Sequence, residues 1–145
     1  MKQLHSAKAV FAVVGLAVLA FAAPASAETY LRVNIPFEFM VGGQVLPPGA
    51  YRITIDPNYS LSHIDSLSDG SIHRVILEPG PALPHGANPD TGIVQFKKYG
   101  ETYSLSGIWR PGFTDGLAPV PSRHHNELAK RNGAGGIVNV DADHR

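Results

Sequence analysis

Apolar residues recur at every second position in many short stretches of this chain, between glycine, proline, asparagine and aspartate. A period of two is typical of strands with one buried face, and short strands at this spacing are typical of a sandwich or barrel. The clearest strand is predicted over 50–56, where Tyr51, Ile53 and Ile55 alternate with other residues. Shorter runs precede it over 30–34 and 37–41. The pattern predicts an all-β fold, an antiparallel β-sandwich or a partly open barrel.

Two hairpins are indicated by turn residues between alternating runs. Asp69-Gly70 joins 61–65 to 72–78, because Asp-Gly readily adopts the positive φ angles of a two-residue turn. Such a turn predicts these cross-strand pairs: Ile64 with Val75, and Asp65 with Arg74.

The second hairpin joins 92–98 to 102–109 through residues 99–101. Its alternation predicts one buried face and one solvent-exposed face. The buried face is predicted to carry Val94, Phe96, Tyr103, Leu105 and Trp109. The exposed face is predicted to carry Gln95, Lys97, Ser104 and Ser106.

The remaining segments lack this period. Four prolines between 79 and 90 predict a long surface loop, and 110–121 is predicted to be irregular. Ser122 is a suitable N-cap for a single helix that reaches Asn132 and ends at Gly133. The apolar face of this helix is thin, so it is expected on the sheet edge or surface. A flexible tail is predicted over 133–145, although 137–140 could form an edge strand.

The N-terminus has the three parts of a secretory signal peptide. Lys2 and Lys8 are followed by an uncharged apolar run over 9–23 and by small residues at Ala25 and Ala27. Signal peptidase accepts only short side chains at such positions, so cleavage is predicted between Ala27 and Glu28. An uncleaved anchor is the alternative, but the run is shorter than the ~20 residues that span a bilayer. The predicted organisation is a signal peptide over 1–27, a single β domain with terminal helix over 28–132, and the tail.

The composition indicates the cellular compartment of the protein and excludes one class of partner. The chain has no cysteine, hence neither a lipid-acceptor thiol nor disulfides, which favours a bacterial envelope protein, periplasmic or secreted. Loss of the leader removes two basic residues and no acidic one, which takes the formal charge from zero to −2. Nucleic acid is therefore not an expected partner. No membrane span is expected after processing, and the partner is predicted to be an unknown ligand or envelope component.

Histidines are the candidate metal ligands. His124, His125 and Glu127 lie together at the start of the predicted helix, but a zinc site needs three or four ligands and no H-E-x-x-H pattern is present. A solvent-exposed helix face explains the same residues. His63 and His73 are predicted to lie on opposite faces of the first hairpin. No metal or cofactor is predicted.

Nucleophilic catalysis has no local signature, because G-x-S-x-G and cysteine are both absent. A Ser-His-Asp triad assembled from distant segments stays open, since triads are recognised in space. The glycines of 133–136 follow the helix instead of opening it, so they form no phosphate loop. Aromatic residues could line a ligand surface, although burial in the core is the simpler interpretation. These are Tyr30, Tyr51, Tyr59, Tyr99, Tyr103 and Trp109.

Several motifs support a resemblance to a family. They are F-x-V-G at 39–42 with L-P-P-G-A-Y at 46–51, F-x-x-Y-G-x-x-Y-x-L-x-x-x-W at 96–109, and S-x-x-x-x-E-L-A at 122–129. The chain thereby resembles small secreted bacterial β-rich proteins of unknown function. It departs from them at Pro48 and at 118–121, where the family tends to have a basic residue before the helix. The resemblance implies the β fold and export, and it assigns no catalytic residue.

Together these observations predict an exported envelope protein, a non-catalytic binding or structural β module. The alternative is an exported hydrolase or metal-dependent enzyme with a site near His124 and His125. An enzyme would gather histidines and carboxylates in one cleft, whereas a binding module would present a dry or aromatic groove.

Overall fold

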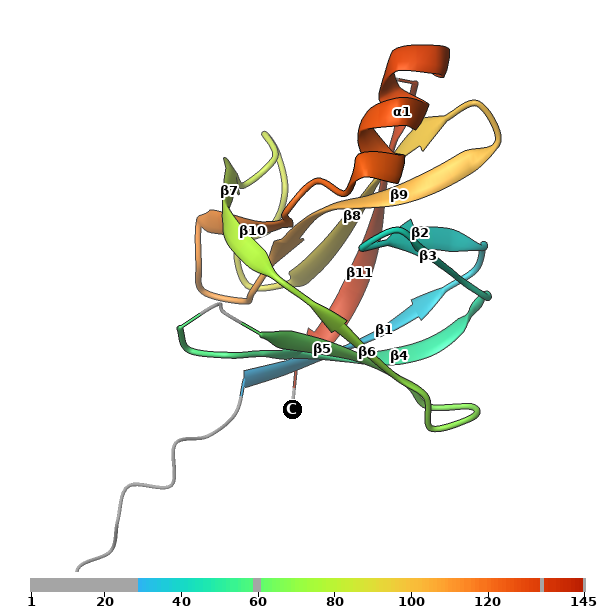
Figure 1. Ribbon diagram of the computed structural model, residues 1–145. Coiled ribbons are helices and arrows are strands. Elements are labelled where there is room, and N and C mark those ends of the chain that lie inside the picture. Colours follow the sequence, from blue (N-terminus) through green and yellow to red (C-terminus); the bar gives the residue numbers. More distant parts are fainter. Residues whose placement is uncertain (1–28, 59–60, 134, 145) are drawn as a thin grey trace, which may run out of the picture.

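A computed structural model describes residues 29–58, 61–133 and 135–144, with the side chain of His144 left undescribed. The predicted signal peptide and its cleavage site lie outside these residues. Figure 1 shows a sheet curled into an open half-barrel, with one helix at its upper end. The prediction of an all-β fold with one short C-terminal helix is confirmed.

The strands follow one another along the chain with a single helix before the last of them. They are β1 (Thr29–Ile35), β2 (Phe39–Val41), β3 (Gln44–Leu46), β4 (Gly49–Ile55), β5 (Ser62–Ser66), β6 (Ile72–Val75), β7 (Leu77–Ala82), β8 (Gly92–Tyr99), β9 (Thr102–Trp109), β10 (Asp115–Pro119), α1 (Arg123–Asn132) and β11 (Ile137–His144).

The order across the sheet is β3-β2-β9-β8-β11-β1-β4-β5-β6, and β10 pairs with both β9 and β7. Every pair is antiparallel except β2 with β9, which is parallel. The chain passes from β6 into β7 after one residue, and β7 leads back through β10 to β9. This return path bends the sheet around a core of aliphatic and aromatic side chains. Phe39 lies at its centre, with its ring centroid 5.2 Å from that of Tyr51 and 5.4 Å from that of Phe96.

The β5–β6 hairpin has a longer turn than predicted. The Ser66 amide donates to the Ser71 carbonyl, so the loop holds four residues instead of two. The Asp69 carboxylate accepts from the Ser71 amide at 2.9 Å and stabilises this wider loop. The register therefore shifts by two residues, and the predicted pairs are wrong. The observed pairs place His73 opposite Ile64 and Arg74 opposite His63. The two histidines lie on opposite faces, as predicted.

The β8–β9 hairpin turns at Gly100-Glu101, and a β-bulge in β9 interrupts its register. Phe96 faces Leu105 as predicted, but beyond the bulge Trp109 faces Ile93 and lies on the other side of the sheet. A bulge adds one residue to one strand and reverses the side that later residues face. The prediction of Trp109 beside Phe96 is therefore wrong.

The predicted solvent-exposed face of this hairpin is also largely covered. Gln95 is 7% exposed and Ser104 is 3% exposed. The β7–β10 pair and helix α1 lie over this side, so the two segments predicted to be irregular, 79–90 and 110–121, each contribute a strand. Trp109 is buried beneath them and its indole Nε1 donates to the Pro81 carbonyl at 3.1 Å. Pro81 can pair in this way because proline keeps its carbonyl acceptor.

The predicted flexible tail is wrong for residues 137–144. They form β11, which pairs with β8 on one side and β1 on the other and so lies in the middle of the sheet (Figure 1). The suggested edge strand over 137–140 is thus longer and central. Its burial alternates at every residue, with Val138, Val140 and Ala142 toward the core, but only Ala142 is fully buried among its described side chains.

Helix α1 agrees with its prediction at both ends. The Ser122 hydroxyl accepts from the His125 amide at 3.1 Å, and Gly133 ends the helix with a φ of 64°. No residue of α1 is fully buried, which confirms its surface position. The cap places His125 at a defined position over the sheet.

Candidate functional site

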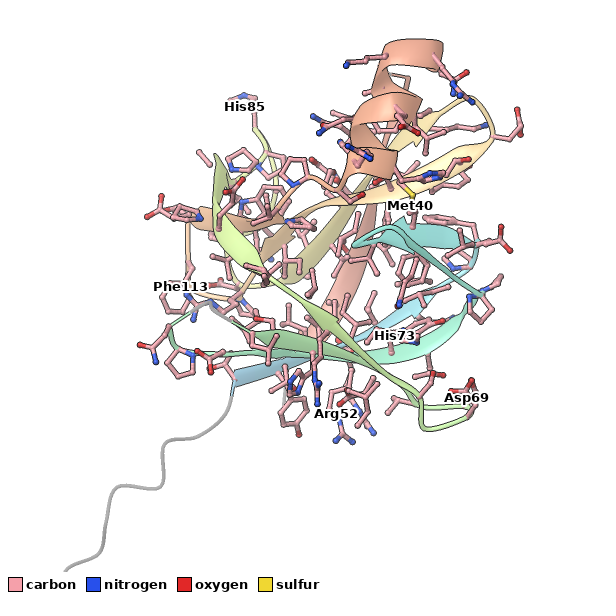
Figure 2. The ribbon with its side chains drawn as sticks, viewed as in Figure 1. Met40, Arg52, Asp69, His73, His85 and Phe113 are labelled. Carbon is pink, nitrogen blue, oxygen red and sulfur yellow. The ribbon has the colours of Figure 1, made fainter. Side chains whose placement is uncertain are left out.

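The edge of β9 is shared by two strands that do not meet. β2 pairs with its first half through Phe39 with Tyr103 and Met40 with Ser104, whereas β10 pairs with its second half at Ile108. A cavity of about 160 Å³ lies in the fork between them, below the start of α1. Figure 2 shows Met40 in this position, under the first turn of the helix. We call it the β9-edge cavity. Its lining consists of Met40, Val41, Gly42, Glu78, Lys97, Ser104, Leu105, Ser106, Ala118, Pro119, Val120, Pro121, Ser122 and His125.

A serine and a histidine meet at one end of this cavity. Ser104 Oγ lies 2.9 Å from His125 Nδ1, and the serine is almost completely buried. The Tyr99 ring contacts the imidazole edge-on, with the ring centroids 5.3 Å apart. The helix cap, the tyrosine and the serine together hold the imidazole in one orientation.

The electrostatic environment favours the neutral imidazole. Burial lowers the pKa of His125, and the positive charge of Lys97 lowers it further. Lys97 lies directly opposite Ser104 on the neighbouring strand. At neutral pH the cavity thus has one neutral hydrogen-bonding pair, the Lys97 ammonium group and the exposed Glu78 carboxylate beside a mainly apolar wall.

Acidification is expected to weaken the fold through His125. Because the folded state lowers the pKa of this side chain, the unfolded chain takes up the proton first as the pH falls below 6.5. The free energy of unfolding should therefore decrease from about pH 7.5 to about pH 5.5, and His125→Gln should remove that part of the decrease. Urea unfolding at the two pH values measures it, with His124→Gln as the exposed control. Equal pH dependence in all three proteins would contradict the expectation.

The chemistry open to the pair is limited by what surrounds it. A serine beside a neutral imidazole is the nucleophile and base of acyl transfer, but a catalytic imidazole is normally oriented by a carboxylate on its second nitrogen. In the described part of the chain no carboxylate makes a hydrogen bond to His125. The arrangement supports hydrogen bonding to a ligand better than proton relay.

The remaining predicted site residues are not brought together. His124 and Glu127 are exposed on α1, His63 lies on the outer face of β5, and His85 is exposed in the loop after β7 (Figure 2). Within residues 29–58, 61–133 and 135–144, apart from the His144 side chain, no group of three or more His, Asp or Glu side chains could hold a metal ion.

A second serine and histidine lie on the β5–β6 hairpin. Ser71 Oγ donates to Asp69 Oδ1 at 2.7 Å and lies 3.2 Å from His73 Nε2. His73 Nδ1 lies 3.1 Å from Gln44 Oε1 on β3. A catalytic triad needs the histidine between serine and carboxylate, whereas here the serine occupies the middle. These contacts stabilise the loop and connect β6 to β3.

The aromatic residues do not form one ligand surface. Tyr51 donates its hydroxyl to the Pro47 carbonyl at 2.6 Å, and Tyr103 stacks on Phe37 with centroids 4.1 Å apart. Tyr30 lies under the guanidinium of Arg52. With Trp109 beneath β7 and Tyr99 against His125, these rings lie at separate places. Tyr59 lies outside the described residues.

Sequence reasoning missed Ser104 as a site residue, because its position in the alternation predicted a solvent-exposed side chain. The alternation did give one indication of its role. Ser104 must face the same side of the hairpin as Ser106, and therefore whatever segment covers that side. The covering helix was predicted with His125 in its first turn, but no local pattern shows over which strand the helix lies.

The fold and the cavity define a class: a curled, half-open β barrel with a capped helix over a small, partly open cavity. The chain matches no known protein family, no curated protein and no solved structure. Of the described residues, none belongs to a helix long and apolar enough to cross a membrane. The family resemblance of the sequence motifs stays a prediction.

Proposed function

We propose that the protein is exported to the bacterial envelope and acts there as a non-catalytic binding module, with its ligand in the β9-edge cavity. The observation that carries the proposal is the combination of an apolar wall with one polar corner. Met40, Leu105 and Pro119 belong to the wall, and Lys97 and His125 belong to the corner. Small-molecule sites typically have this division, in which a few polar groups orient an apolar body.

The dimensions and charge of the cavity indicate the ligand class. A cavity of ~150 Å³ in another protein binds benzene, and this cavity has about 160 Å³. The Lys97 ammonium can pair with one carboxylate, and the Ser104–His125 pair can hydrogen-bond to it. The ligand is a small carboxylic acid whose apolar part is about the size of one ring.

Benzoate is the probe that tests this assignment. In two-dimensional NMR spectra of the full chain, benzoate should shift the backbone signals of Ser104, Leu105 and His125, with a Kd of ~1 mM or tighter. Lys97→Met should weaken binding about tenfold, because it removes the charge but keeps the stem. Lys130→Met on the exposed side of α1 is the matched control. Saturable shifts elsewhere, or none in the cavity, would refute the proposal.

Export has its own test. The protein recovered from the periplasm or medium of an expressing bacterium should begin at Glu28, as measured by intact mass. Retention of Met1 in cytosolic protein would exclude the exported compartment.

A second candidate function, an exported hydrolase, is favoured by the 2.9 Å distance between Ser104 Oγ and His125 Nδ1. A fluorophosphonate probe distinguishes it from the binding module. If Ser104 is a nucleophile, its oxygen attacks phosphorus, fluoride leaves, and His125 takes the hydroxyl proton. Labelling of Ser104 that is lost in His125→Gln would establish the hydrolase, whereas the binding module predicts no labelling.

A further inference from the structure

Two strand edges face each other across an open cleft whose lining shares no residue with that of the β9-edge cavity. β3 and β6 are the two ends of the sheet order, and each has one neighbour in the described structure. The cleft between them has a volume of about 770 Å³ and is lined by Gln44, Val45, Leu46, Ile72, His73 and Arg74. Figure 1 shows both strands on the same side of the molecule.

β3 and β6 do not pair with each other across this cleft. Paired strands lie about 4.8 Å apart, so their backbones exchange hydrogen bonds without side-chain bridges. Here a side-chain contact joins the two strands, with His73 Nδ1 3.1 Å from Gln44 Oε1. Both edges thus remain without a second strand neighbour in the described structure.

The backbone N–H and C=O groups that are not bonded to β2 or β5 point into this cleft. On β3, the two-residue turn at 42–43 makes Val41 and Gln44 a hydrogen-bonded pair, so the next residue, Val45, directs its N–H and C=O away from β2. On β6, the bond from the Ser66 amide to the Ser71 carbonyl places the N–H and C=O of Ile72 and Arg74 away from β5.

The side chains at the mouth of the cleft indicate what a strand bound there would carry. Val45 is 56% exposed and Ile72 is 63% exposed, so two β-branched apolar side chains flank the opening. Arg74 is exposed beside them, and within the described residues no carboxylate pairs with it. An extended segment that carries apolar residues and one carboxylate on the same face would complement these groups, because Ile72 and Arg74 face the same side.

A folded second copy cannot supply such a segment from its described strands. An inserted strand must be free on both edges, whereas every described strand already has at least one neighbour. We propose that the β3–β6 cleft captures an extended segment of a partner polypeptide by β-strand addition, with apolar residues beside Val45 and Ile72 and a carboxylate on Arg74. The main chain supplies affinity in this mode, and alternate side chains supply specificity. This inference is independent of the ligand in the β9-edge cavity.

A capped octapeptide tests the inference, in which valine alternates with threonine and one central valine is replaced by aspartate. The aspartate takes a valine position because Ile72 and Arg74, two residues apart on β6, face the same side. Its fluorescently labelled form should bind the full chain saturably in an anisotropy titration. The same peptide N-methylated at alternate residues should bind at least about tenfold more weakly, because it cannot donate to one of the edges. Hydrogen exchange should slow on binding at 44–46 and 72–75.

Two protein variants complete the experiment. Val45→Pro removes an edge N–H that makes no bond to β2, and it should reduce affinity about tenfold, while Val45→Thr keeps the N–H and should bind within about twofold of the original. The N-methylated peptide keeps the test valid if Val45→Pro does not fold. Equal binding of both peptides, or protection outside the two strands, would overturn the inference. So would a concentration-dependent dimer that protects 44–46 and 72–75 without peptide, since a second copy would then occupy the cleft.

Discussion

A chain that ends at Gly136 should not fold. The truncation removes β11, which pairs with β8 over residues 137–142 and with β1 over residues 142–144. Its loss leaves two unpaired edges in the middle of the sheet, opens the core at Ala142, and separates the β8–β9 half from the β1–β4 half. Domains of this size are stable by only about 5–15 kcal/mol, which the removal of a central strand exceeds. Circular dichroism and thermal unfolding should show no cooperative transition.

The control for this truncation is a chain that ends at His144, which keeps all of β11 and should unfold like the full chain. A synthetic peptide of residues 137–145, added in trans, should restore a cooperative transition because the vacant position pairs on both sides. A truncated chain that unfolds with the Tm of the full chain would show that β11 does not hold the halves together.

Local chemistry explains which parts of the fold were predictable from the sequence. The strand around Tyr51 and the capped helix after Ser122 each depend on residues close in sequence, and both have the predicted structure. The turn within 99–101 was also predictable from local residues, although the sequence left two positions open and the structure has the one at Gly100-Glu101. The alternation of β11 predicts a strand but does not show whether it lies at an edge or in the middle of a sheet. Its two neighbours, β1 and β8, are distant in sequence, and pairing with both makes it a central strand.

Of the Ser104–His125 pair, the sequence pointed only to His125, because the contact between the two residues depends on segments that are distant in sequence. His125 was a candidate because of its position in the helix, but for metal binding. Its contact with Ser104 depends on how α1 crosses β9, which no periodicity encodes. The side that Trp109 faces depends on the bulge, a single inserted residue that alternation does not show.

Gly107→Ala should destabilise the fold by about 2 kcal/mol, because the Trp109 indole occupies the place of the new methyl group. A Cβ at position 107 would lie 2.6 Å from Trp109 Cζ3 and closer still to Cη2. The ring cannot withdraw, since its Nε1 donates to the Pro81 carbonyl and its other side lies against Gly116, where a Cβ would meet Nε1 at 2.6 Å. The overlap outweighs the ~0.5–1 kcal/mol that alanine normally gains over glycine within a strand.

Chemical unfolding of four variants measures this effect and its cause. Gly136→Ala is the matched control, because a Cβ there meets nothing within 4 Å, and it should change the free energy of unfolding by less than about 0.5 kcal/mol. Trp109→Leu destabilises the protein by itself. When Gly107→Ala is added to Trp109→Leu, however, it should lower the free energy of unfolding far less than it does in the original chain. The difference is the coupling energy between the two positions, expected at about 1–3 kcal/mol. Additive effects would mean that the methyl group and the indole do not compete for the same space.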